Sequence, residues 1–325
     1  MLRDGLDRLD AALRAHRTVV AELAAADADV IALQEVEAGL LAALIAQPWV
    51  RASYTLDVDP LGPDVDRTGL VVLSRLPVIE AGRFALSAHK AVSAIVVETG
   101  GGPLVVAATH LTSDHTANGP SKRRAQLARV AEAFAGVEGD VVLVGDFNDG
   151  GRRPAAVLGM RDAWLEARSD ETPTFDPVAN PLASVSSLSG RASRLDRVFL
   201  RGRLRCVEAD LLGTGPADLF VSDHYGVLAR VAPVVPSADV LESSPTPRTA
   251  VVWLPRAVPP AVEQVRREHD PRADRWPPHV TVLFGFVPES DFERAVPLLS
   301  QAVAEVPAFP VRVETRSRSR PGRER

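Results

Sequence analysis

Two polar side chains, Asp146 and Asn148, stand directly behind a short apolar run and could do chemistry together. The run, VVLV at 141–144, has the length and the β-branched composition of a buried strand. Residues two apart on a strand share a face, so we expect the carboxylate and the carboxamide on one side of the chain. At a strand end, an acid can activate water and an amide can bind a phosphate oxygen. The alternative is a plain strand-to-turn junction, because Asp, Asn and Gly are all turn formers.

Other ionisable side chains also stand in or at the ends of predicted strands. They are Glu35, His110, Asp196, Asp223 and His224. Asp196 lies inside an apolar strand pattern (RLDRVFL), where a surface role does not readily explain a carboxylate. Glu35 could instead be a loop acid, and His110 a core histidine. A strand followed by an acid is typical of layered α/β domains that bind ligands at strand ends.

Apolar periodicity predicts the elements that must position these side chains. Spacings of three and four residues predict an amphipathic first helix that ends near Ala26, and a second helix over 120–135. A loop rich in Pro, Ser and Gly is expected over 172–193. Few helices separate the strands, so much of the sheet should be antiparallel. Strands are predicted over 27–33, 52–58, 69–74, 92–99, 104–109, 141–144, 194–200, 206–212 and 225–231.

Six segments, taken together, resemble the motifs of the endonuclease/exonuclease/phosphatase superfamily. They are LQEV (33–36), GLVVLSRLP (69–77), THL (109–111), GDFN (145–148), RLDRVFL (194–200) and SDH (222–224). One such motif is weak evidence, but six in the family's order and near its spacing are specific. The resemblance runs from about residue 2 to residue 231. It implies a four-layer α/β sandwich, in which two mostly antiparallel sheets have helices outside them.

The resemblance also implies a role for each acidic or amide side chain. Glu35 and Asp223 would bind the metal, because hard oxygen ligands suit Mg²⁺, with Mn²⁺ as a substitute. Asp146 would orient or deprotonate the attacking water, and Asn148 would contact the phosphate. Hydrolysis of a phosphodiester needs this combination of a neutralised anion, a positioned water and a stabilised leaving oxygen.

Two histidines would meet the phosphate. The resemblance places His224 on the scissile phosphate, with Asp196 fixing its orientation and raising its pKa, as in other carboxylate–imidazole pairs. His110 would be a second imidazole on the phosphate oxygens.

One feature departs from the family pattern. The family begins with a strand that ends in an asparagine, which helps to bind metal and phosphate. The asparagines of this chain are Asn118, Asn148 and Asn180, and none precedes the first helix. We therefore expect the sandwich to lack its first strand, which should leave an unpaired strand edge. This departure favours an alternative reading, a catalytically impaired nucleic-acid-binding module.

A second resemblance covers the C-terminal part of the chain. TAVVWLP (249–255) and WPPHVTVLFGF (276–286) resemble the 2H phosphoesterases, which include 2′-5′ RNA ligase-like proteins and pair two H-x-T motifs across a cleft. His279 and Thr281 match one motif, and no histidine follows. One imidazole cannot serve as both acid and base of a pair, so this α+β half-domain should be inactive as it stands. Its predicted elements are strands over 250–254 and 279–286 and helices over 260–268 and 290–303.

Composition bounds the remaining questions. At 325 residues, with 46% hydrophobic and 24% charged residues, the chain is long enough for one large and one smaller globular domain. No apolar run reaches membrane-spanning length. Cys206 is the only cysteine, which favours a reducing cytoplasm. The predicted organisation is a catalytic domain over 1–232, a Pro/Ser-rich linker over 233–248, the partial 2H domain over 249–315 and a disordered basic tail over 316–325.

These observations favour a Mg²⁺-dependent phosphodiesterase that acts on nucleic acid. The attached 2H fragment favours RNA over DNA. The net charge of -5 means that any grip on nucleic acid must be local. A second enzyme reading, a phosphomonoesterase that acts on a small or lipid phosphate, also fits the family. The sequence indicates no protein partner.

Overall fold

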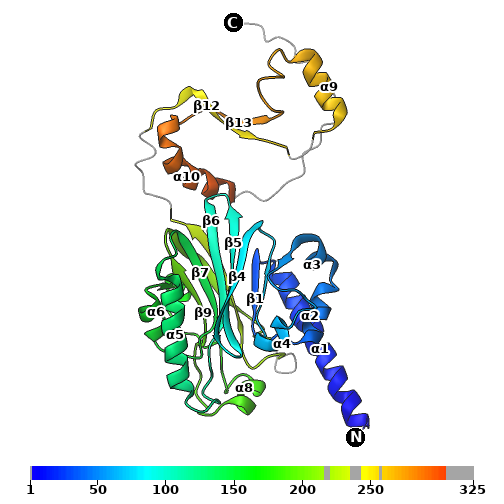
Figure 1. The fold of residues 1–325 in the computed structure, drawn as a ribbon, viewed down its shortest axis with the longest axis vertical. Helices are drawn as coiled ribbons and strands as arrows, with labels where there is room; N and C mark the ends of the chain where they lie inside the picture. Colours follow the sequence, from blue (N-terminus) through cyan, green and yellow to red (C-terminus); the bar gives the residue numbers. More distant parts are fainter. Residues whose placement is uncertain (1, 216–219, 235–242, 256–257, 305–325) are drawn as a thin grey trace. The chain divides into compact units, whose positions relative to one another are not determined.

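The computed structural model describes residues 2–215, 220–234, 243–255 and 258–304. The chain divides into two compact units, Met1–Val235 and Pro236–Arg325, and each has its own elements (Figure 1). No helix in the described part of the chain has the length and apolar character needed to cross a bilayer.

A six-stranded sheet forms the centre of the first unit. Its strand order is β4-β5-β6-β7-β9-β8. The strands are β4 (Val78–Ser87), β5 (Lys90–Thr99), β6 (Gly102–His110), β7 (Asp140–Asp146), β9 (Asp196–Arg201) and β8 (Arg161–Asp162). All neighbouring pairs run antiparallel except β6 and β7, which are parallel and are joined through the helix α5 (Gly119–Ala135). Because β6 and β7 are parallel, both finish at the same edge of the sheet.

A second β layer faces this sheet and consists of two hydrogen-bonded pieces. One piece has the order β1-β3-β2, and the other pairs β10 with β11. Their strands are β1 (Val30–Leu33), β3 (Val71–Ser74), β2 (Thr55–Leu56), β10 (Leu204–Leu212) and β11 (Gly226–Pro233). Side chains of both pieces pack in one core with the six-stranded sheet, including Val72, Ile95, Val142, Val198 and Cys206. Among the described residues β1 pairs only with β3, so the predicted unpaired edge is present.

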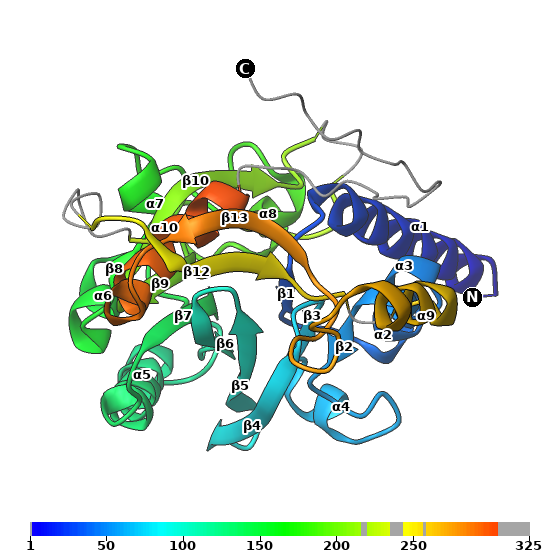
Figure 2. The same ribbon diagram turned by 90° about the horizontal axis from the view of Figure 1, so that it is seen from above.

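Helices cover the outer faces of both β layers (Figure 2). The helices α5 and α6 (Arg153–Leu158) pack on the six-stranded sheet around Leu127, Phe134 and Phe199. A third core lies between the β1-β3-β2 piece and the helices on its outer side. Those helices are α1 (Leu2–Ala26), α2 (Ala38–Ile45), α3 (Pro48–Ser53) and α4 (Asp64–Thr68). The predicted four-layer α/β sandwich of mostly antiparallel strands is confirmed.

The sequence misplaced several local elements. The strand predicted over 52–58 is reduced to the two residues of β2, because α3 continues to Ser53. The ten-residue strand β4 was not predicted. It is an edge strand whose side chains are mostly exposed, so it lacks the apolar run that marks a buried strand. The predicted loop 172–193 contains the short helix α8 (Pro181–Ser186). The short helix that the sequence predicts around Trp164 is present as α7 (Ala163–Ala167).

The second unit is a small α+β fold with one antiparallel pair of strands. Its elements are β12 (Thr246–Trp253), α9 (Pro260–His269), β13 (Val280–Phe286), the 3₁₀ helix η2 (Glu289–Asp291) and α10 (Phe292–Ala304). β12 begins inside the segment predicted as linker, and the predicted tail 316–325 lies outside the described residues.

Candidate active site

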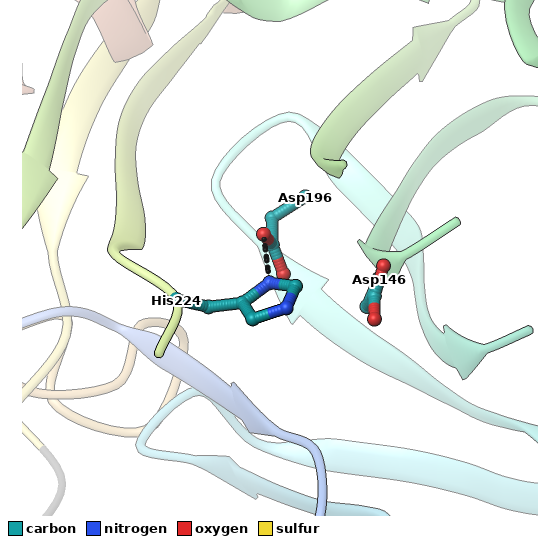
Figure 3. A group of neighbouring side chains, drawn as sticks. All are labelled: Asp146, Asp196 and His224. Carbon is teal, nitrogen blue, oxygen red and sulfur yellow. Dashed lines mark hydrogen bonds and ion pairs between the residues drawn. The ribbon is translucent and has the colours of Figure 1, made fainter. Parts of the chain in front are cut away.

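Three neighbouring strands bring the predicted site residues together at one edge of the six-stranded sheet. In register, His110 of β6 lies opposite Asp146 of β7, and Asp146 lies opposite Asp196 of β9. His224, just before β11, reaches this edge, and its Nδ1 lies 2.7 Å from Asp196 Oδ2 (Figure 3). One potential ligand atom from each of Asp146, Asp196 and His224 lies within 4.8 Å of the others. The site is therefore assembled from residues that are far apart in the chain.

Asp146 is held in one orientation by Asn148. Asp146 Oδ1 accepts a hydrogen bond from the Asn148 backbone N–H, and Oδ2 accepts one from the Asn148 amide, both at 2.7 Å. Asn148 also donates from Nδ2 to the Leu111 carbonyl at 3.0 Å. Both amide hydrogens of Asn148 are thus engaged within the protein. Asn148 orients Asp146 here, and its predicted contact with phosphate stays a prediction.

The backbone before Asp146 requires a glycine. Gly145 has a φ of +136°, and a Cβ at this position would lie 1.9 Å from the Thr109 carbonyl oxygen. A side chain would therefore separate β6 from β7 next to His110 and Asp146. The glycine of GDFN allows the two strands to approach closely at the site.

Burial gives Asp146 the pKa of a proton acceptor. The residue is 7% exposed. Burial, followed by the negative charge of Asp196, raises the pKa of Asp146 to about 7. A carboxylate with a pKa near the working pH is well suited to accept a proton from water.

His224 carries a positive charge at neutral pH. Burial acts to lower its pKa, but the hydrogen bond and the charge of Asp196 outweigh burial and raise the pKa to about 9. An imidazolium at the edge of the sheet can bind an anionic oxygen or give it a proton.

His110, in contrast, is neutral. Burial lowers its pKa to about 3, and the positive charges of Lys90 and His224 act in the same direction. His110 Nε2 lies 3.5 Å from Asp146 Oδ2 and 3.8 Å from Glu35 Oε1. Because the imidazole is uncharged, these are polar contacts and not ion pairs. They link Glu35 to the rest of the site.

The two predicted metal ligands, Glu35 and Asp223, lie outside the group of three. The Glu35 side chain is 79% exposed, and the residue has a φ of +54°. Asp223 Oδ2 accepts a hydrogen bond from Ser186 Oγ of α8 at 2.7 Å, and Asn180 Nδ2 donates to the neighbouring Ser222 carbonyl at 2.9 Å. Neither Ser186 nor Asn180 was predicted as a site residue, because each acts on a group more than 35 residues away in the chain.

The donor set fits a hard divalent cation. Asp146 and Asp196 each place one carboxylate oxygen within 4.8 Å of the other and of a ring nitrogen of His224, and oxygen ligands of this kind suit Mg²⁺. Glu35 and Asp223 do not belong to that group. The negative charge of Asp196 adds to the effect of burial in raising the pKa of Asp146, so these two carboxylates repel each other. A bound cation would relieve that repulsion.

Lys90, at the start of β5, is a site residue that the sequence did not reveal. Burial lowers the pKa of its half-buried ammonium group, while the charges of Asp146 and Glu35 act to raise it. A cation among these acids can bind a phosphate oxygen. The sequence offered one indication of Lys90: lysine is rare in this chain, and Lys90 and Lys122 are its only lysines.

Replacing Lys90 should weaken turnover. We expect Lys90→Met to lower kcat/KM about 10- to 100-fold, because it removes a charged hydrogen bond worth roughly 1.5–3 kcal/mol. The measurement is metal-dependent hydrolysis of bis-nitrophenyl phosphate. Lys122→Met, at the exposed first turn of α5, is the matched control and should behave like the wild type. Equal rates for the two variants would contradict the role of Lys90.

The H-x-T residues of the second unit lie on exposed backbone. His279 precedes β13, and its Nδ1 lies 2.8 Å from the Pro277 carbonyl oxygen. Thr281 pairs with Val252 and is also exposed. In the described part of the second unit no group of three potential metal ligands forms. The prediction that this half-domain is inactive stays a prediction.

Comparison with family models assigns the first unit. A model of the endonuclease/exonuclease/phosphatase family matches residues 5–224, which is more than half of the chain. The chain belongs to this family. It is therefore a metal-dependent phosphoric ester hydrolase, and the predicted family is confirmed. A model of the 2′-5′ RNA ligase superfamily matches residues 254–324, which confirms the second resemblance.

Solved structures share the fold of the first unit. Zebrafish (D. rerio) TDP2 complexed with a single-strand DNA product is 24% identical, with a TM-score of 0.57 over 70% of this chain and 95% of that one. Caenorhabditis elegans TDP2 is 23% identical, with a TM-score of 0.54 over 69% and 71%. An endonuclease/exonuclease/phosphatase from Bacteroides vulgatus is 17% identical, with a TM-score of 0.51 over 68% and 90%. No curated protein sequence matches the chain significantly.

Proposed function

We propose that this family member is a Mg²⁺-dependent phosphodiesterase that cleaves nucleic acid. One observation carries the proposal: a buried carboxylate, Asp146, with a pKa near 7 lies beside an imidazolium, His224, that Asp196 holds in place. This is a proton acceptor next to an anion-binding cation, and hydrolysis of a phosphodiester needs both.

Each side chain has a distinct part in this proposal. His224 binds the scissile phosphate and stabilises the charge that grows on it. Asp146 takes a proton from the attacking water, and neutral His110 donates a hydrogen bond to a phosphate oxygen. Glu35 and Asp223 would hold Mg²⁺ or Mn²⁺, which neutralises phosphate charge and stabilises the leaving oxygen.

Fewer observations bear on which nucleic acid is the substrate than on the type of reaction. The family name covers both nucleases and phosphatases, and the zebrafish TDP2 structure contains a single-strand DNA product. The preference for RNA over DNA depends only on the match of the C-terminal part to the 2′-5′ RNA ligase superfamily. Because the net charge is -5, electrostatic binding of RNA or DNA must come from local cations such as Lys90 and His224.

The proposal predicts metal-dependent cleavage of single strands. Labelled RNA and DNA oligonucleotides of one sequence would be incubated with the full chain, with Mg²⁺, Mn²⁺ or EDTA. We expect EDTA to lower the rate at least about 10³-fold, because a catalytic metal contributes several kcal/mol, and either metal to restore it.

Small substrates separate the alternatives. Hydrolysis of nitrophenyl phosphate with intact oligonucleotides and intact bis-nitrophenyl phosphate would replace the proposal with a phosphomonoesterase. Binding of oligonucleotides without cleavage of any substrate would support the impaired binding module instead.

A further inference from the structure

The segment that precedes α8 touches both halves of the Asp196–His224 pair. Thr174 is fully buried, and its hydroxyl oxygen accepts hydrogen bonds from the backbone N–H groups of Leu195 and Asp196, both at 3.0 Å. The Thr174 carbonyl accepts a hydrogen bond of 2.7 Å from the N–H of Tyr225, which directly follows His224. One residue thus fastens the two chain segments that carry the carboxylate and the imidazole.

Phe175 continues this contact on the imidazole itself. Its ring centroid lies 5.1 Å from that of His224, with the two planes tilted by 55°. The Phe175 backbone forms single antiparallel bridges to Ser193 and to His224. The aromatic ring limits the movement of the imidazole on one side, while Asp196 Oδ2 fixes its Nδ1.

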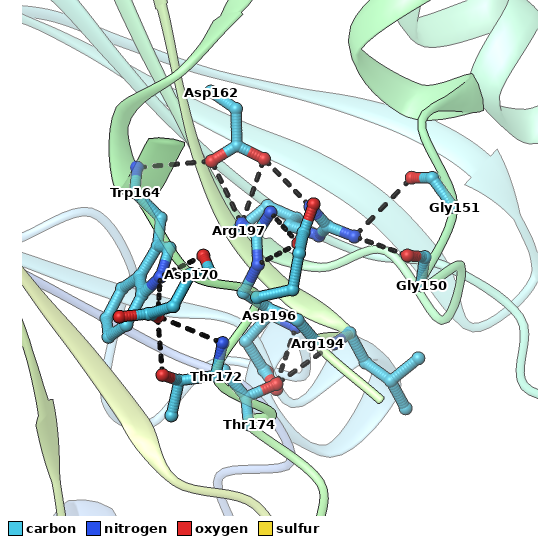
Figure 4. A network of polar contacts seen from close by, with 12 residues as sticks. Gly150, Gly151, Asp162, Trp164, Asp170, Thr172, Thr174, Arg194, Asp196 and Arg197 are labelled. Carbon is cyan, nitrogen blue, oxygen red and sulfur yellow. Dashed lines mark hydrogen bonds and ion pairs between the residues drawn. The ribbon is translucent and has the colours of Figure 1, made fainter. Parts of the chain in front are cut away.

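An ion network centred on the buried Arg194 anchors this segment to the sheet (Figure 4). The Arg194 guanidinium, with a side chain 2% exposed, donates to both carboxylate oxygens of Asp162 at 2.9 Å and to Glu171 Oε2 at 2.6 Å. Asp162 Oδ2 also accepts a hydrogen bond from Arg197 Nη1 at 2.8 Å. Glu171 lies only three residues before Thr174, so the network holds the start of the segment against the strand that carries Asp196.

We propose that Thr174 and Phe175 are positioning residues that set the geometry of the Asp196–His224 pair for catalysis. This inference rests on the proposed function, because it assumes that His224 acts on the phosphate. Thr174 never reaches the phosphate itself, since its hydroxyl is buried and engaged. Its removal should therefore lower turnover more than it weakens substrate binding. A displacement of about 1 Å in a catalytic group can cost about 10²-fold in rate.

Variants of Thr174 test the proposal. Thr174→Val keeps the shape but removes the acceptor of two buried N–H groups, and we expect kcat to fall about 10- to 100-fold with KM changed less than about threefold. Thr174→Ser keeps the hydroxyl and should remain within about threefold of the wild type. Thr172→Val is the matched control, because among the described residues the Thr172 hydroxyl bonds to Asp170 of the same segment and to no group of the Asp196–His224 pair.

A spectroscopic measurement makes the result independent of turnover. In histidine-labelled protein, the Nδ1–H proton of His224, assigned with a His224→Gln variant, reports its hydrogen bond to Asp196. Thr174→Val should shift or broaden this resonance, and Thr172→Val should leave it unchanged. If the wild type cleaves no phosphodiester, the proposed function fails, but the resonance still tests the positioning.

Three results would overturn the positioning role. The first is a Thr174→Val variant whose kcat and His224 resonance equal those of the wild type. The second and third are a fall in kcat in Thr174→Ser, or in Thr172→Val, as large as the fall in Thr174→Val. Should Thr174→Val not fold, Phe175→Leu decides, because it removes the ring but keeps the backbone hydrogen bonds to Ser193. An unchanged kcat and an unchanged His224 resonance in Phe175→Leu would then reject the proposal.

Discussion

Asp146→Asn should lower kcat for phosphodiester cleavage by about 10²- to 10⁴-fold, the range that a positioned general base contributes. Asparagine has nearly the same shape but cannot accept a proton from water at neutral pH. The backbone hydrogen bond from Asn148 to the side-chain oxygen at position 146 can still form, whereas the amide nitrogen that replaces Oδ2 cannot accept the hydrogen bond from Asn148 Nδ2. The measurement is kcat at saturating Mg²⁺ on the best oligonucleotide and on bis-nitrophenyl phosphate.

The same variant should not lose stability above neutral pH. The pKa of Asp146 is about 7 in the folded chain, against an ordinary value of 3.8. Between these two pH values the carboxyl group is protonated in the folded state but ionised in the unfolded state. Ionisation of Asp146 therefore destabilises the fold progressively as pH rises from about 4 to 7, and asparagine removes that penalty. Because this relief outweighs the loss of the hydrogen bond from Asn148 Nδ2, we expect a melting temperature at pH 8 equal to or above that of the wild type.

Asp149→Asn provides the control for this prediction. Asp149 lies three residues from Asp146, bonds the Gly151 N–H and faces Arg153 at 3.6 Å, outside the site. It should retain turnover within about threefold. Equal loss in Asp149→Asn, or full turnover in Asp146→Asn, would remove Asp146 from the mechanism.

The sequence correctly predicted site residues that stand at strand ends, but the expected backbone geometry was not always correct. Asp146 and Asn148 do meet, as expected. However, Asn148 is not extended: its φ is +50°, and the chain turns so that its N–H reaches the Asp146 carboxylate. The contact is thus a side-chain-to-backbone turn and not a shared strand face. The turn alternative considered for this segment therefore describes the backbone correctly, while both side chains still face the site.

Residues that act through tertiary contacts could not be predicted in this way. Lys90 opens β5, and it faces acids of β7 and of the segment after β1 only once the two β layers have packed. Ser186 lies in a segment whose composition predicts a loop. Thr174 carries no motif, because its importance comes from backbone groups about twenty and fifty residues further along the chain. Local patterns reveal strand ends, whereas the groups that orient them depend on topology.

Asp196→Asn should displace the whole pH profile towards acid and lower kcat at pH 8 by about 10²-fold or more. In the wild type, turnover should rise as Asp146 loses its proton near pH 7 and fall as His224 loses its proton near pH 9. Asp196 raises both pKa values, through its charge on Asp146 and through its hydrogen bond and charge on His224. A neutral amide removes both effects.

Both limbs of the profile should therefore move in the same direction. The alkaline limb should fall from about 9 towards the ordinary imidazole value of about 6.5, and the acid limb should fall below 7 because Asp146 loses a like-charged neighbour. A residue that only held His224 in place would lower the rate without moving either limb. Asp210→Asn, at an exposed position of β10, should leave the profile unchanged. If Asp196→Asn moves only the alkaline limb, Asp196 acts on His224 alone, and the raised pKa of Asp146 must come from burial.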